Sequence, residues 1–161
     1  MMKHIQVSRR FKLTRDVTTE DLKSTLLDSL RSAFDIEKVE DSGEKLRITG
    51  TTGGRDSINR HARVNLDVRV MKQQEMARFI VTGTSGMARS LLIGYIGLVI
   101  LVLLAGLLPG SIETSGVDSD ALDTLVLMVF GIFIFYDINK KIGEPKEYLD
   151  SILQSLETEF G

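Results

Sequence analysis

The chain of 161 residues contains no cysteine and no tryptophan, and it has only two prolines and two histidines. Without cysteine, the protein cannot form disulfide bonds or offer a thiolate to a metal or a substrate. The two histidines, His4 and His61, lie in unrelated segments and match no metal-ligand spacing. No phosphate-binding loop or serine nucleophile motif is present either. We therefore expect no catalytic residues, no metal and no cofactor, and predict that the protein is not an enzyme.

Charge is also missing from one long stretch. Residues 1–89 carry 17 Lys and Arg and 12 Asp and Glu, whereas residues 90–112 carry no charged side chain. The mean hydropathy of +0.07 is thus an average over unlike parts. The sequence predicts a cytoplasmic α+β domain over residues 1–86, a transmembrane helical hairpin over 87–142 and a cytoplasmic amphipathic helix over 143–161.

The predicted hairpin has spans at about residues 91–108 and 121–138, joined by an acidic external loop over 109–120. Eighteen apolar residues at a rise of about 1.5 Å each approach the thickness of a bilayer core. A pair of buried helices in a soluble bundle is the alternative. Lys and Arg flank the spans and are absent from the loop, which favours cytoplasmic termini. We expect an integral protein of the bacterial inner membrane, with small residues that allow helices to pack closely: Ser90, Gly94, Gly97, Gly106 and Gly131.

Within the first 86 residues, apolar and polar side chains alternate as in β-strands in several segments, and one segment has the spacing of an amphipathic helix. A strand over residues 4–13 precedes a helix capped by Thr18 or Thr19, and four strands follow near residues 36–40, 45–49, 63–70 and 78–82. The short connections favour an antiparallel sheet. We expect a β-α-β-β-β-β domain whose sheet packs one face on the helix.

Basic residues gather on the opposite face of this predicted sheet. Residues 1–87 carry 16 basic and 12 acidic side chains, a net charge of +4. A solvated face with local ion pairs is one interpretation, and a surface for an anionic ligand or lipid headgroups is the other. We do not expect nucleic acid as a partner, because the charge is modest and no aromatic residues are interleaved for stacking. The candidate anion-binding residues are Arg10, Lys12, Arg47, Arg55, Arg60, Arg63 and Arg69, and Arg78 lies near the same face.

The last residues form an acidic amphipathic pattern. Pro145 is suited to a helix start, and an apolar stripe follows at helical spacing: Leu149, Ile152, Leu153, Leu156 and Phe160. Residues 138–161 carry three Lys and five acidic side chains. An acidic helix is poorly suited to anionic lipid. We expect it to dock on protein, either on its own basic domain or on a neighbouring copy.

These features favour a non-catalytic, membrane-anchored accessory or scaffold subunit that uses its domain and C-terminal helix for protein–protein interaction. A lipid bilayer and a homo-oligomer or larger membrane complex are the expected partners. One alternative is a regulatory or sensor module that binds an anionic ligand through its Arg-rich surface. A second is an ion or solute conduit made of oligomerised hairpins.

Overall fold

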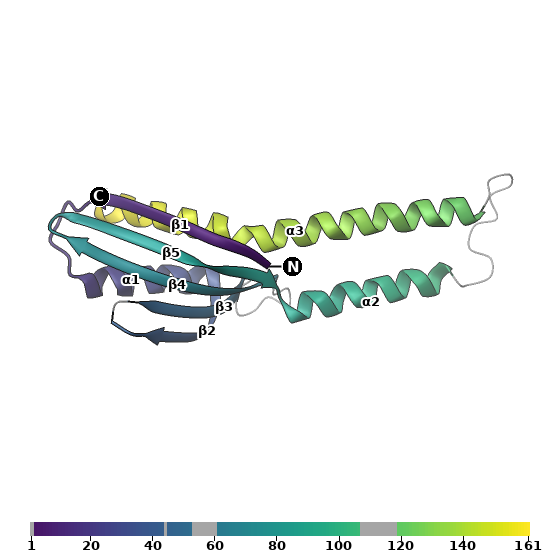
Figure 1. Cartoon of the computed structure of the whole chain (residues 1–161), viewed down its shortest axis with the longest axis horizontal. Coiled ribbons are helices and arrows are strands. Elements are labelled where there is room, and N and C mark those ends of the chain that lie inside the picture. Colours follow the sequence, from purple (N-terminus) through teal and green to yellow (C-terminus); the bar gives the residue numbers. More distant parts are fainter. Residues whose placement is uncertain (1, 44, 53–60, 107–118) are drawn as a thin grey trace.

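The computed structural model describes residues 2–43, 45–52, 61–106 and 119–161 of the chain. The elements follow in the order β1 (Met2–Lys12), α1 (Thr19–Ala33), β2 (Phe34–Asp41), β3 (Leu46–Thr52), β4 (Ala62–Gln73), β5 (Met76–Met87), α2 (Arg89–Gly106) and α3 (Ser119–Phe160). Figure 1 shows a twisted sheet at one end of the molecule, and α2 and the first half of α3 extending from it. The strand–helix–four-strand order agrees with the sequence prediction.

The five strands form one antiparallel sheet in the order β1-β5-β4-β3-β2. The last strand therefore lies between the first strand and β4. Alternate residues of β4, from Ala62 to Val70, are buried, and the residues between them face outward. This period of two is the pattern of a sheet with one covered face.

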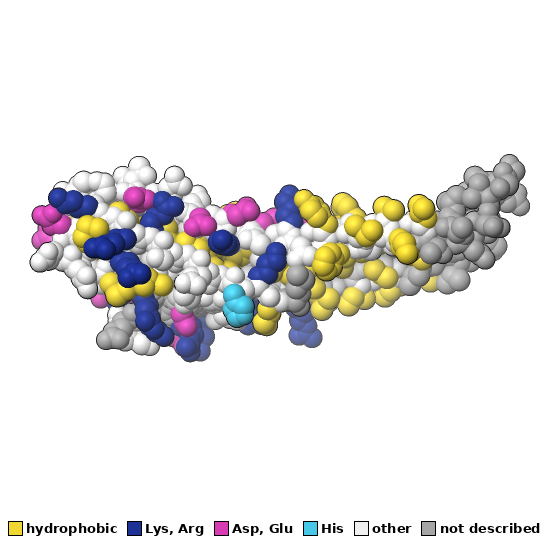
Figure 2. Space-filling model, turned by 45° about the horizontal axis from the view of Figure 1, so that its top comes forward, with side chains coloured by type: hydrophobic (Ala, Val, Ile, Leu, Met, Phe, Trp, Pro, Cys, Tyr) yellow, Lys and Arg dark blue, Asp and Glu magenta, His cyan; other side chains and the backbone are white. Residues whose placement is uncertain are grey.

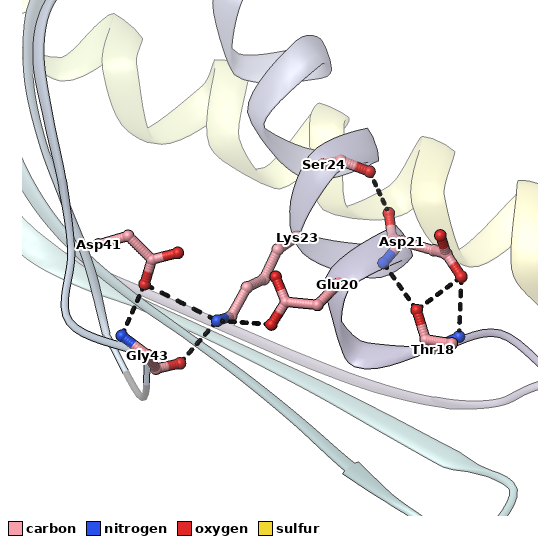
Figure 3. Close-up of polar contacts among 7 residues, drawn as sticks. All are labelled: Thr18, Glu20, Asp21, Lys23, Ser24, Asp41 and Gly43. Atoms are coloured by element: carbon pink, nitrogen blue, oxygen red, sulfur yellow. Dashed lines mark hydrogen bonds and ion pairs between the residues drawn. The ribbon is translucent and has the colours of Figure 1, made fainter.

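Helix α1 begins at a capping box. The Thr18 hydroxyl accepts a hydrogen bond from the backbone N–H of Asp21, whose carboxylate accepts one from the backbone N–H of Thr18. One turn later, the ammonium of Lys23 donates to the carbonyl of Gly43 over 2.6 Å and lies near Glu20 and Asp41 (Figure 3). Lys23 is only 6% exposed. These contacts fasten the start of α1 to the turn between β2 and β3.

Two helices cover the inner face of the sheet. Leu22, Leu26 and Leu30 of α1 are fully buried in the same hydrophobic cluster as residues of the second half of α3. That half of α3 lies along β1 (Figure 1) and buries the five residues of the predicted apolar stripe: Leu149, Ile152, Leu153, Leu156 and Phe160. The C-terminal helix is thus part of the core.

The predicted transmembrane hairpin is the main error of the sequence analysis. Over the described residues, no helix combines the length and the apolar character that crossing a bilayer requires. The described part of α2 ends at Gly106, before the predicted end of the first span. The second predicted span is one part of a helix of 42 residues, with acidic residues near both ends of its apolar run. The predictions of a transmembrane hairpin and of an integral inner-membrane protein are therefore wrong.

The C-terminal helix also begins earlier than expected. Pro145 lies inside α3, although a proline inside a helix removes one backbone donor and disfavours the conformation. The helix runs from Ser119 to Phe160 without a break, so the predicted boundary at residues 142–143 falls within one element. Packing of the apolar stripe on the sheet and α1 offsets the local cost of the proline. Of the predicted loop over 109–120, residues 109–118 lie outside the described residues.

Candidate interaction surfaces

The helices beyond the sheet carry a large exposed apolar surface. We call α2, together with residues 125–138 of α3, the apolar arms. Figure 2 shows hydrophobic side chains over this half of the molecule. Apolar side chains of α2 are 39% to 64% exposed and those of α3 are 45% to 68% exposed: Leu92, Ile93, Ile96, Leu98, Val99, Ile100, Leu101 and Leu104, and Leu125, Val126, Leu127, Met128, Val129, Ile132, Phe133, Phe135 and Tyr136.

The exposed residues lie on every side of the arms. Leu125 to Val129 are five consecutive exposed residues, and five consecutive residues of a helix point in all directions around its axis. Contiguous apolar patches larger than a few hundred Å² are rare on isolated soluble proteins and mark interaction surfaces. Each arm therefore exposes apolar side chains around its whole circumference.

Small residues of the arms face open space. Among the described residues, a Cβ atom added at Gly94, Gly97 or Gly131 would meet no atom within 4 Å apart from its chain neighbours and the backbone of its own helix. These glycines, predicted to allow close helix packing, are therefore not used for packing α2 against α3 within the described chain. Ser90 lies in the first turn of α2 and Gly106 at its end. The three open positions are places where another helix can approach closely.

A polar contact joins the two arms near the sheet. The Tyr95 hydroxyl of α2 donates a hydrogen bond to the Asp137 carboxylate of α3, and the Lys141 ammonium lies 3.0 Å from the same carboxylate. Burial and the hydrogen bond to Asp137 raise the pKa of Tyr95 to about 12, whereas the hydrogen bond from Tyr95 lowers the pKa of Asp137. Tyr95 is thus a neutral donor and Asp137 a charged acceptor over the physiological range.

Three of the five predicted anion-binding residues that the structure describes are paired with acids. The Arg47 guanidinium lies 3.1 Å from the Asp67 carboxylate, and the Arg63 guanidinium lies 3.6 Å from the Glu37 carboxylate. The Lys12 ammonium lies 3.0 Å from the Glu75 carboxylate. Arg55 and Arg60 fall outside the described residues. For Arg47, Arg63 and Lys12, local ion pairs are what the structure shows.

Three arginines on the same face differ from these. Arg10, Arg69 and Arg78 are exposed, and none of them has an acidic partner within 4 Å among the described residues. Arg10 of β1 lies directly opposite Arg78 of β5. Met71 of β4 lies on the other side of Arg78, and Arg69 is two residues before it. We call Arg10, Arg69 and Arg78 the arginine cluster.

Two members of the cluster, Arg10 and Arg78, line a small hollow at the end of the sheet remote from the arms (Figure 1). The hollow has a volume of about 80 Å³ and is lined by Arg10, Arg78, Met71, Met76 and Gln73. Figure 2 shows Lys and Arg side chains gathered around hydrophobic ones at this end. The sequence analysis named Arg10 and Arg69 as candidates and placed Arg78 near the same face. The pairing of β1 with β5, which brings Arg78 opposite Arg10, joins distant segments and leaves no local signal in the sequence.

The two histidines lie apart. His4 is exposed on β1, whereas His61 directly precedes β4. Within the described residues, no group of three or more His, Asp or Glu side chains is placed to hold a metal ion. The absence of enzyme activity stays a prediction.

Comparisons with known proteins found no relative. No protein-family model matches the chain, and neither a curated protein nor a solved structure is significantly similar to it. Any function therefore has to be argued from the molecule itself.

Proposed function

We propose that this protein is a non-catalytic assembly subunit that associates with a second copy of itself through the apolar arms. The observation that carries the proposal is the contrast in burial along the chain. The leucines of α1 and of the second half of α3 are fully buried, whereas the apolar side chains of the arms are about half exposed. Leaving such side chains in water costs about 25 cal/mol for each Å² of apolar surface.

A second copy supplies the complementary surface. Its arms are also apolar on all sides, so two pairs of arms pack as a helical bundle in which each helix meets several neighbours. The open positions at Gly94, Gly97 and Gly131 allow helices to approach closely. Two-fold homodimers are also the commonest closed assemblies of soluble proteins. The sheet and its two covering helices remain outside this bundle.

The chain offers a direct test because it contains no cysteine. Ile132→Cys places a single thiol on an arm, and Gln154→Cys places one on the exposed side of the packed half of α3. Oxidation in intact cells should crosslink the Ile132→Cys protein to a species of twice the 17.9 kDa chain mass. The matched Gln154→Cys protein should remain monomeric under the same conditions.

Each alternative has its own outcome. A crosslinked species of Ile132→Cys at another mass means that a different protein covers the arms. A disulfide requires Cα atoms within about 7 Å, so Leu127→Cys and Phe135→Cys are oxidised in parallel to sample other sides of the arm. A product of another mass, or no product from any of the three variants, contradicts self-association. Coexpression of chains with tags of two sizes identifies the crosslinked partner, because only a crosslink between two copies of this chain gives a mixed product of intermediate size.

A further inference from the structure

The arginine cluster stands apart from the other charged groups of the outer sheet face. Each of Lys12, Arg47 and Arg63 has a carboxylate within 4 Å, whereas Arg10, Arg69 and Arg78 have none among the described residues. Like charges directly opposite each other on neighbouring strands destabilise a sheet. Arg10 and Arg78 occupy such a pair of positions. An anion placed between them removes this cost.

We propose that the arginine cluster binds a phosphoryl group. The guanidinium is a planar fork whose donors match phosphate oxygens two at a time. Arg10 and Arg78 provide forks from neighbouring strands, and Arg69 lies on the next strand, diagonal to Arg78. Diagonal neighbours on a sheet face are about 7–8 Å apart, within reach of long side chains. Three cations complement the two negative charges of a phosphoryl group better than they complement the single charge of a carboxylate.

The hollow limits what else the ligand contributes. Pockets that enclose drug-sized ligands occupy about 300–1,000 Å³. The hollow of about 80 Å³ takes one small group, and the rest of the ligand lies outside it. Met71 and Met76 line the same hollow as Arg10 and Arg78 and give it an apolar side. The shared chemistry is therefore a terminal phosphoryl group, carried either by a free small molecule or by a lipid headgroup.

The test uses the full-length protein and two probes, inorganic pyrophosphate and vesicles that contain phosphatidic acid, each at about 150 mM salt, close to physiological ionic strength. Replacing Arg10 and Arg78 together by Gln removes two charge-assisted contacts. We expect binding to weaken by about 10-fold to 100-fold. Arg69→Gln alone should weaken it by a smaller factor, because one contact is lost.

The matched control is the double variant Arg47→Gln with Arg63→Gln. It makes the same change in charge on the same sheet face, but at arginines that already have acidic partners. Binding should change by no more than about twofold in this control. Saturable binding of pyrophosphate that depends on the cluster identifies a free phosphoryl ligand, and cluster-dependent binding of the vesicles alone identifies a headgroup.

Two results overturn the proposal. One is equal weakening in both double variants, which indicates attraction by net charge alone. The other is the absence of saturable binding to either probe. Loss of the fold does not explain a loss of binding if the Arg10→Gln, Arg78→Gln protein melts at the same temperature as the unchanged protein or higher. A higher melting temperature is expected, because two like charges have been removed from opposite positions.

Discussion

The two halves of α3 belong to one continuous helix and carry similarly large apolar side chains, yet their surroundings are opposite. In the second half, Leu149, Leu153 and Leu156 are fully buried against the sheet and α1. In the first half, Leu127 and Ile132 are 45% and 68% exposed. The second half alternates its apolar stripe with acidic residues, whereas the first is apolar on every side. An apolar stripe is satisfied by one sheet face, but a helix that is apolar all round needs partners on several sides.

The polar contacts of the two halves of α3 differ in the same way as their burial. The second half joins the sheet by polar contacts as well: Arg9 of β1 lies 2.6 Å from Glu157, and the Thr14 backbone N–H donates to the Phe160 carbonyl over 2.9 Å. At the junction, the buried Ser85 hydroxyl donates to the Ile142 carbonyl over 2.8 Å. Beyond the junction, the contact between Tyr95 and Asp137 joins the arms to each other rather than to the sheet. We call the sheet, α1 and residues 142–160 of α3 the body. Its buried contacts with α3 end near Ile142, and a further contact joins the Lys3 ammonium of β1 to the Asn139 carbonyl over 2.8 Å.

The largest expected effect tests whether the two halves differ in their contribution to folding. Leu153→Ala should lower the free energy of unfolding by about 2–5 kcal/mol, because it opens a cavity in the core. Leu127→Ala, the matched change on the arm, should lower the stability of the body by no more than about 0.5 kcal/mol. Urea denaturation followed by circular dichroism measures both changes.

Protein concentration separates folding from association in this comparison. If Leu127 acts only between copies, the effect of Leu127→Ala on the denaturation midpoint should shrink as the protein is diluted. The effect of Leu153→Ala should persist at every concentration. Equal and concentration-independent losses in the two variants would show that the arms belong to the folded core.

A smaller effect is expected at the polar contacts of the second half. The side chains of Arg9 and Glu157 are 32% and 41% exposed, so solvent screens this ion pair. A double-mutant cycle with Arg9→Gln and Glu157→Gln should give a coupling energy of about 0.2–1 kcal/mol. The pair of Lys12 and Glu75, whose side chains are 71% and 73% exposed, should give a lower value in a parallel cycle. A larger coupling energy for Lys12 and Glu75 than for Arg9 and Glu157 would show that the contact between β1 and α3 adds nothing beyond an exposed ion pair.

Much of the body was predictable because its signals are local. The alternation of Val64, Leu66, Val68 and Val70 indicates a half-buried strand, and Thr18 with Asp21 indicates a helix start. The position of β5 between β1 and β4 was not predictable from such signals. It depends on pairing between residues 64 to 84 positions apart, from Lys12 with Met76 to Met2 with Gly86, which leaves no local pattern in the sequence.

The errors concern regions where local composition and overall context disagree. A run of apolar residues indicates either a bilayer or a protein partner, and periodicity alone does not separate them. Pro145 is suited to a helix start, but α3 continues through it, and Ile142 before it and Leu149 after it are both buried. Strand parity places Arg10, Arg47 and Arg78 on one face of the sheet, but only the cross-strand register distinguishes Arg47, which has an acidic partner, from Arg10 and Arg78, which have none among the described residues.

The last prediction concerns the polar contact between the arms. A neutral Tyr95 stabilises the folded protein by its burial and its hydrogen bond, so its pKa in the folded state, about 12, lies above the reference value of 10.0. The group binds its proton more tightly when folded, and its contribution is complete below pH 10. That contribution is lost as the pH rises from about 10 to about 12. In a variant with Tyr136→Phe and Tyr148→Phe, Tyr95 is the one remaining tyrosine, and its ultraviolet phenolate absorbance should report the raised pKa. Adding Asp137→Asn should lower that pKa only part of the way, because burial is the largest cause and remains. An unshifted titration near pH 10 in the variant without Asp137→Asn would show that the arms separate at this contact.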